Sequence, residues 1–391
     1  MKRKSITLFL AATTFVAGCQ LDNRKSITLS PTQEYFNATT PYSINLKHAS
    51  QLRYREDSIT KTEQLYLFNE EYGIINRYGL RKKDLHADGV YDISKVFPNT
   101  QIVPEGFYVI SADSILFLSG ARNEFCLTDG NFEPKYRWSL SKAIRPYGIS
   151  IYASYQPLGY WKKRIYTQLA PNLGSTIHDK AKFNQANSVP KGAVTFLGES
   201  MRLLNEQGHF PKFLSADHSY NTHGPDFCVT NTGTAVYSFG AFPELYVYPP
   251  DGSRRKVIAR SRYHQPPQEF PFEKYIDYRY LREYKLRNSE YGNILHDSYR
   301  QVYLRVYEHG TVGRGGALPI DDFSKKPWSL MILNEDLQVL KEIKFPHTYN
   351  PNSILVTRRG LLISPTRPGL PTYQSKQIPF QLFVYTQAQK P

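Results

Sequence analysis

Residues 65–69 read LYLFN, an apolar string that ends in Asn and is followed by two Glu residues and a second apolar-rich segment. Five further strings have the same form: FCLTD at 125–129, MRLLN at 201–205, LYVYP at 245–249, LMILN at 330–334 and LFVYT at 382–386. All but the last lead into a turn rich in Asn, Asp, Glu or Gly, and usually into a returning strand. The repeat therefore predicts a series of antiparallel β-hairpins.

The spacing of these strings favours a closed ring. Successive strings begin 44 to 85 residues apart, and propeller blades take about 40–50 residues before loops are inserted. A ring also hides the edges of its strands. We predict an all-β fold, a β-propeller of six blades with four antiparallel strands each. The alternatives are a β-sandwich array, two β-domains, or a seventh blade between residues 245 and 330.

Composition agrees with a folded β-protein. The 391 residues are 40% hydrophobic and 21% charged, and they include 30 Tyr and 22 Phe. Aromatic side chains suit strands, and this balance excludes a disordered chain, a collagen, a coiled coil and a polytopic membrane protein.

Closure of the ring needs a partner for the blade that contains the last string. Residues 26–30 and 41–46 have strand character, and we expect them to complete that blade and tie the two ends of the chain together. Two insertions interrupt the repeat. Residues 172–190 are polar and turn-rich, which predicts a long loop, whereas the four-residue recurrence of apolar side chains within 265–289 predicts a short helix.

The N-terminus has the pattern of a bacterial lipoprotein signal. A basic start is followed by an apolar run from Ser5 to Val16 that is too short to cross a bilayer, and then by Val16-Ala17-Gly18-Cys19. We predict a signal peptide over 1–18, lipidation of Cys19, a lipidated tether over 19–40 and the propeller domain over 41–391. The alternative is an ordinary cleavable signal with an accidental Cys.

The predicted cellular location is the cell envelope. Gln20 stands where an Asp would resemble an inner-membrane retention signal, so we expect an outer-membrane lipoprotein, facing either the periplasm or the outside. The membrane, through the lipid anchor, is therefore the first predicted partner. The oxidising envelope allows a disulfide between Cys126 and Cys228. Both residues lie in apolar strings that we place in different structural units, which favours two buried thiols instead.

Positive charge is concentrated in one part of the chain. The formal net charge is +15, and removal of the signal peptide lowers it to +12. Residues 253–305 contain twelve Lys or Arg and six Asp or Glu, so they carry half of the mature excess. Such a surface attracts acidic glycans or lipid headgroups, although we favour the simpler explanation of a solvated basic face near an anionic membrane. The predicted address argues against nucleic acid as a partner.

Residues 299–307, YRQVYLRVY, alternate as a strand does. One face carries Val302, Leu304 and Val306, and the opposite face carries aromatic and cationic side chains. Arg305 can stack on the neighbouring Tyr rings, which predicts a ligand wall that faces the channel. The alternative, which we favour, is packing between blades, with Arg305 hydrogen-bonded across them.

A second aromatic and cationic stretch is GYWKKR, in which Trp161 precedes three cations. An exposed aromatic ring beside cations suits sugar stacking or headgroup contact, and a ring that merely covers a blade is the alternative. The candidate ligand-binding residues are therefore Tyr299, Arg300, Tyr303, Arg305 and Trp161.

Signatures of enzymes are missing from the sequence. It contains no GxSxG, no HExxH and no phosphate-binding loop. His218, His223 and Asp226 lie close together in the sequence, but spacing alone does not make ligands converge on a metal. We therefore name no catalytic residue, no metal site and no cofactor, and we lean towards a non-enzyme.

These features together resemble a lipoprotein family called domain of unknown function 4221, whose members are similar to six-bladed propellers of Gram-negative envelopes. The resemblance rests on the lipobox, the hairpin repeat and the segment 292–305, GNILHDSYRQVYLR, with its Asp, its Arg and its aromatic–Arg pair on a strand. It implies the fold and the location and no established activity.

The sequence thus favours an outer-membrane-tethered lipoprotein with a non-catalytic binding or scaffolding propeller that contacts a protein, a peptide or a glycan. The alternative function is an envelope hydrolase or lyase that acts on an acidic glycan, since the basic stretch would attract polyanions.

Overall fold

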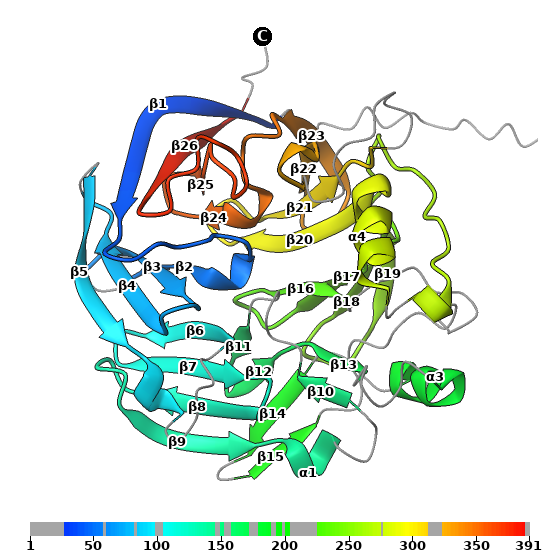
Figure 1. The fold of residues 1–391 in the computed structure, drawn as a ribbon, viewed down its shortest axis with the longest axis horizontal. Coiled ribbons are helices and arrows are strands. Elements are labelled where there is room, and N and C mark those ends of the chain that lie inside the picture. Colours follow the sequence, from blue (N-terminus) through cyan, green and yellow to red (C-terminus); the bar gives the residue numbers. More distant parts are fainter. Residues whose placement is uncertain are drawn as a thin grey trace, which may run out of the picture.

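Six four-stranded antiparallel blades surround a central axis in the computed structural model (Figure 1). The structure describes residues 27–387 except 58–59, 82–83, 98–104, 145–148, 152–157, 172–178, 189–192, 198–199, 204–224, 275–276 and 312–322. The fold predicted from the hairpin repeat is confirmed.

The strands of each blade follow one another from the innermost to the outermost. Blade 1 consists of β2 (Leu52–Glu56), β3 (Glu63–Asn69), β4 (Ile74–Gly79) and β5 (Asp84–Asp92). Blade 2 consists of β6 (Gly106–Ser111), β7 (Ser114–Ser119), β8 (Glu124–Thr128) and β9 (Pro134–Ser139). Blade 3 consists of β11 (Gly159–Trp161), β12 (Arg164–Tyr166), β14 (Ala193–Leu197) and β15 (Ser200–Leu203).

The second half of the ring repeats this order. Blade 4 consists of β16 (Asp226–Val229), β17 (Ala235–Ser238), β18 (Glu244–Tyr248) and β19 (Arg255–Ile258). Blade 5 consists of β20 (Glu290–Asp297), β21 (Val302–Glu308), β22 (Trp328–Leu333) and β23 (Val339–Phe345). Blade 6 consists of β24 (Leu355–Val356), β25 (Leu361–Ile363), β26 (Gln377–Gln387) and β1 (Ile27–Thr39).

The remaining elements are short. A separate pair is formed by β10 (Ile149–Ile151) and β13 (Leu169–Pro171). The α-helices are α1 (Ser141–Ile144), α3 (Lys180–Ser188) and α4 (Tyr278–Arg287). The 3₁₀ helices are η1 (Ala49–Gln51), η2 (Ser94–Val96), η4 (Phe272–Lys274), η5 (Phe323–Lys325) and η6 (Pro351–Ser353).

The six strings that predict the fold occupy different positions within their blades. Those at 125–129, 245–249, 330–334 and 382–386 fall on third strands, whereas LYLFN forms most of a second strand and MRLLN begins on a fourth. The five strings on second and third strands read alike because the middle strands of a blade are buried on both faces by neighbouring blades. In β22, for example, all six residues are buried. Hydrophobic strings therefore mark blades without marking a fixed strand.

Blade 6 is closed by the N-terminal strand. β1 pairs antiparallel with β26 from Ile27 opposite Gln387 to Thr39 opposite Gln377. This confirms a strand at 26–30 and moves the start of the propeller to residue 27, so the boundary predicted at residue 41 is wrong. Residues 41–46 do not form a strand. They bond instead to the 373–375 loop, through the Ile44 amide to the Ser375 carbonyl and the Leu46 amide to the Tyr373 hydroxyl.

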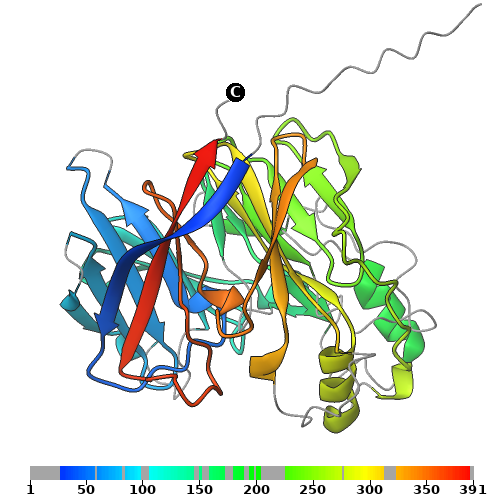
Figure 2. The same ribbon diagram turned by 90° about the horizontal axis from the view of Figure 1, so that it is seen from above.

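The two faces of the ring differ in their connections (Figure 2). Turns of two to six residues join first to second strands and, in blades 1 to 5, third to fourth strands, and we call this side the short-turn face. β1 begins and β26 ends on that side. The opposite side, the long-loop face, carries connections such as 259–289 and 364–376, and α4 lies there, away from the start of β1 and the end of β26.

The two predicted insertions have different outcomes. The helix predicted within 265–289 is confirmed as α4, where the Asp277 side chain caps the N-terminus by accepting a bond from the Tyr280 amide. The predicted loop over 172–190 is wrong for α3, because Asp179 accepts a bond from the Lys182 amide and the Phe183 ring packs on Phe272 at 5.1 Å.

The two cysteines outside the N-terminal segment lie in different blades, as predicted. Cys126 is on β8 and Cys228 is on β16, and both are buried and free. Burial raises the pKa of both thiols. Neither is a reactive thiolate at neutral pH.

Deletion of residues 27–39 should abolish cooperative folding. Ile378, Phe380 and Leu382 of β26 are at most 4% exposed, and without β1 this strand becomes a bare apolar edge. We expect no cooperative transition in thermal unfolding followed by circular dichroism. Deletion of residues 388–391, beyond the last strand, is the control and should leave the melting temperature unchanged. A cooperative melt of the 27–39 deletion would refute closure by β1.

Candidate functional site

Both faces of β21 pack against other blades. Val302, Leu304 and Val306 belong to the apolar cluster that blade 5 shares with blade 6. Tyr303 and Tyr307, on the opposite face, belong to the cluster shared with blade 4, and they are 6% and 1% exposed. The predicted alternation is therefore confirmed, but the predicted ligand wall is wrong for β21, because its aromatic face is covered by the neighbouring blade.

Arg305 is the central polar link between blades 4 and 5. Its side chain is fully buried, and its Nε donates to the Ser238 hydroxyl at 3.0 Å. Its two terminal nitrogens donate to the carbonyl oxygens of Phe242, Pro243 and Ala259 at 2.8–3.0 Å. The guanidinium carbon lies 3.7 Å from the centre of the Tyr291 ring.

These contacts account for the charge of the buried guanidinium. Burial lowers the pKa of Arg305 to about 9, while Tyr291 and the more distant Asp226 and Glu244 act in the opposite direction. Arg305 has little donor capacity left for a ligand. Arg305 is therefore a link between packed blades, which was the alternative to a ligand wall.

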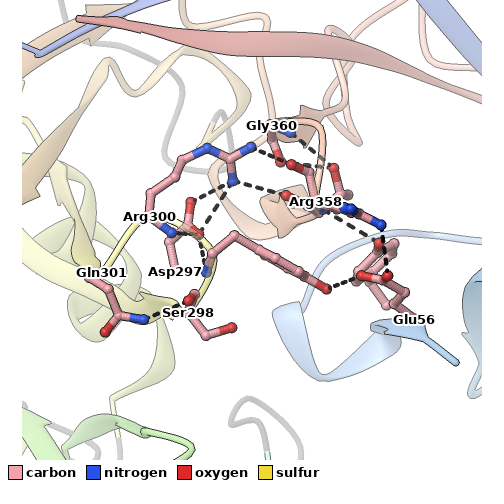
Figure 3. A network of polar contacts seen from close by, with 10 residues as sticks. Glu56, Asp297, Ser298, Arg300, Gln301, Arg358 and Gly360 are labelled. Atoms are coloured by element: carbon pink, nitrogen blue, oxygen red, sulfur yellow. Dashed lines mark hydrogen bonds and ion pairs between the residues drawn. The ribbon is translucent and has the colours of Figure 1, made fainter. Parts of the chain in front are cut away.

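Arg300 joins blade 5 to blade 6 on the short-turn face (Figure 3). It lies in the β20–β21 turn, where its Nη1 bonds to the buried Asp297 carboxylate at 3.0 Å and to the Thr357 carbonyl at 2.9 Å. Its Nη2 donates to the Arg358 carbonyl at 2.7 Å. The guanidinium also lies 4.7 Å from the ring centre of Tyr385. Arg300 therefore holds two inner turns together.

Tyr299 extends this network to blade 1. Its hydroxyl donates to Glu56 Oε2 at 3.0 Å, and the other Glu56 oxygen pairs with Arg358 at 3.3 Å (Figure 3). Tyr299 nevertheless stays 42% exposed. It is the one exposed residue among the five candidate ligand-binding residues.

Trp161 is the last residue of β11, and its ring packs against blade 4. Its indole nitrogen donates to the Asn231 carbonyl at 3.2 Å in the β16–β17 turn. The ring lies so close to Gly233 that a Cβ there would fall 2.4 Å from it. Trp161 therefore covers a blade junction, and it shares the short-turn face with Tyr299 and Arg300.

The long-loop face carries a charged cluster that the sequence did not reveal. Lys326 has no exposed side-chain surface, and its Nζ bonds to the Lys285 carbonyl at 2.9 Å and to Glu290 at 3.1 Å. Glu308 lies 3.8 Å from the same ammonium and 3.6 Å from Arg367. The sequence held one indication of this cluster. Glu290 and Glu308 lie at the two outer ends of the β20–β21 hairpin, where they pair with each other. We call Lys285, Glu290, Glu308, Lys326 and Arg367 the mouth cluster.

Lys285 differs from the other cations of the mouth cluster. It is half-buried at the end of α4. Burial lowers the pKa of its ammonium, Lys326 acts in the same direction, and Glu290 and Glu308 oppose them. An amine with a lowered pKa loses its proton more easily than an ordinary lysine. Lys285 can therefore serve as a base when neutral and as a cation when protonated.

Metal binding finds no support in the described part of the chain, where His, Cys, Asp and Glu do not gather in threes. His218 and His223 lie outside the described residues, and Asp226 begins β16. None of the described helices combines the length and apolar character that a bilayer crossing requires.

The architecture defines a six-bladed β-propeller whose inner arginines tie neighbouring blades together. No protein-family model matches the chain, and a comparison with curated proteins finds no match. Among solved structures, it is similar to a member of the DUF4221 family from Bacteroides vulgatus, with a TM-score of 0.75 and 17% identity over 93% of this chain and 100% of that chain. This likeness shows a common fold, in agreement with the family resemblance of the sequence.

Two further propellers are more distant. Virginiamycin B lyase from Staphylococcus aureus has a TM-score of 0.43 and 7% identity over 91% of this chain and 99% of that one. The calcium-binding protein regucalcin from Agrobacterium tumefaciens has a TM-score of 0.42 and 9% identity over 90% and 96%.

Replacement of Arg305 should destabilise the ring. Arg305→Met leaves three buried carbonyl groups without their donors, and we expect the free energy of unfolding to fall by about 3 kcal/mol or more. Urea denaturation measures the change. Arg255→Met, on exposed β19, is the matched control and should change stability by about 0.5 kcal/mol or less. Equal stability of the two variants would show that Arg305 is not a structural link.

Proposed function

We propose that this chain is an outer-membrane lipoprotein, anchored through Cys19, whose propeller binds or scaffolds an envelope protein, peptide or glycan without catalysis. The observation that supports this proposal is that the start of β1 and the long loops lie on opposite faces of the ring. β1 begins on the short-turn face, and the long loops lie on the other side of the ring.

The tether sets the orientation. Cys19 and Ile27 are eight positions apart, with seven residues between them, and an extended chain of eight residue steps reaches about 28 Å at most. The short-turn face is thus held near the bilayer, and the long-loop face points away from it. Loops on a rigid scaffold are the usual place for recognition, so the long-loop face, with the mouth cluster, is the proposed contact surface.

Site-specific photocrosslinking tests the contact surface. A p-benzoylphenylalanine in place of Arg279, exposed on α4, should form protein or glycan adducts in intact cells. The same group in place of Ala112, exposed in the β6–β7 turn of the short-turn face, is the matched control and should not. Mass spectrometry of the adducts identifies the partner. Adducts from position 112 but not from 279 would refute the orientation.

The anchor has its own readout in the same cells. Cys19→Ser should lose incorporation of labelled fatty acid and should leave the membrane fraction. Labelling that persists in Cys19→Ser would refute the lipid anchor without bearing on the contact surface.

The second candidate function, a hydrolase or lyase for an acidic glycan, is favoured by one observation. Lys285, with its lowered pKa, lies near both anion-attracting cations and carboxylates of the mouth cluster. A base beside cations is what proton abstraction next to a carboxylate requires.

A turnover assay decides between the two functions. The binding proposal expects no new reducing ends or unsaturated sugars when purified protein is incubated with acidic polysaccharides. The enzyme alternative expects turnover that falls about a hundredfold or more in Lys285→Met. Arg255→Met, an exposed cation on the short-turn face, is the control and should keep full activity.

A further inference from the structure

The β11–β12 turn presents two lysines in an unfavourable conformation. Lys162 and Lys163 have φ angles of 43° and 67°. Both lie in the left-handed region, which tight hairpin turns usually fill with Asn and Gly because a Cβ is strained there. Both lysines are exposed. The chain thus keeps two cations at a tip where uncharged residues would be more relaxed.

Trp161 fixes this tip rigidly. The indole is bonded to Asn231 and lies against Gly233, while Lys162 Nζ lies 4.9 Å from the ring centre. The base of the tip is therefore pinned to blade 4, and the two lysines extend from a fixed position on the short-turn face.

The β18–β19 turn of blade 4, on the same face of the ring, adds more positive charge. Arg254 and Arg255 lie exposed where the β18–β19 turn ends. Asp251, in the same turn, accepts a bond from the Ser253 amide. We call Lys162, Lys163, Arg254 and Arg255 the blade 3–4 patch. None of its members forms an ion pair within the part of the chain that the structure describes.

Most other described cations of the short-turn face are already neutralised, with exposed Arg81 in the β4–β5 turn as an exception. Arg300 pairs with Asp297, Arg358 with Glu56 and Arg359 with Glu34. These pairs lie around blades 5, 6 and 1. Among the described residues, the unpaired positive charge of this face is therefore concentrated on blades 3 and 4.

The patch and the anchor lie on opposite sides of the ring. β1 starts from blade 6, which faces blade 3 across the central axis (Figure 1). A tether at one edge alone lets the propeller tilt on the membrane. A second attachment at the far edge would hold the whole short-turn face parallel to the bilayer.

We propose that the blade 3–4 patch binds anionic phospholipid headgroups and, together with the lipid anchor, lays the short-turn face flat on the membrane. The inference rests on the proposed anchoring, which brings this face to the bilayer. Headgroup phosphates complement the four cations, and each cation near an anionic surface strengthens binding about fivefold. The lipid then supplies attachment, and the patch supplies orientation.

Vesicle binding tests the patch without the anchor. The Cys19→Ser chain, which carries no lipid, is sedimented with vesicles of phosphatidylcholine alone or with phosphatidylglycerol added. We expect binding only to the anionic vesicles, with a loss of most of it in high salt. Lys162→Glu/Lys163→Glu should weaken this binding about tenfold or more.

The matched control has the same change of net charge on the other face. Arg260→Glu/Arg279→Glu alters two exposed cations of the long-loop face, and its binding should stay within about twofold of the parent chain. Equal weakening in both variants, salt-independent binding or equal binding to neutral vesicles would overturn the proposal. Because the assay needs no lipidation, its failure is distinct from a failure of the anchor.

Discussion

The pairing of β1 with β26 is the constraint on which the rest of the propeller depends. A ring of blades is stable only when each blade has neighbours on both sides, because the apolar faces of its strands are covered by those neighbours. Blade 6 takes its outermost strand from the start of the chain and its other three strands from the end. β1 also touches blade 1, since residues 37–39 pair in parallel with 84–86 of β5. One strand thus completes a blade and links it to the next.

Charged side chains lock the blades that this closure brings together. Arg305 joins blades 4 and 5 in the interior, and Arg300 joins blades 5 and 6 at the short-turn face. Both reach backbone carbonyl groups of the neighbouring blade. Carbonyl groups at strand ends and turns lack ladder partners, and a planar guanidinium satisfies several of them at once. The arginines therefore stabilise the ring in places where a ligand site was expected.

Much of the fold was predictable because its determinants are local. Strings such as LYLFN and LMILN report strands buried on two sides, and the Asn, Asp and Gly residues after them report turns. The helix α4 followed from periodicity. The segment 41–46 misled because its alternation reflects burial of Ile44 and Leu46 against blades 1 and 6, whereas its backbone bonds to a loop more than 300 residues away.

The sites were less predictable because they depend on which blade faces which residue. YRQVYLRVY has an aromatic, cationic face, but sequence alone does not say that blade 4 covers it. The mouth cluster escaped notice because Lys285, Lys326 and Arg367 come from three separate loops. The blade 3–4 patch combines turns that lie about ninety residues apart. Charge composition flagged a basic region from 253 onward, yet only the geometry separates its paired cations from its unpaired ones.

Ring closure also determines which strand waits longest for its partner when the chain emerges from one end. Thr28 and Thr386, which meet across β1 and β26, are 358 positions apart. If the chain is exported from its N-terminus, β1 reaches the envelope first and waits for its partner until nearly the whole polypeptide has crossed. During that time an amphipathic strand stands open to other chains. The first strand to emerge is thus the last to find its partner, and its edge stays open for the longest time.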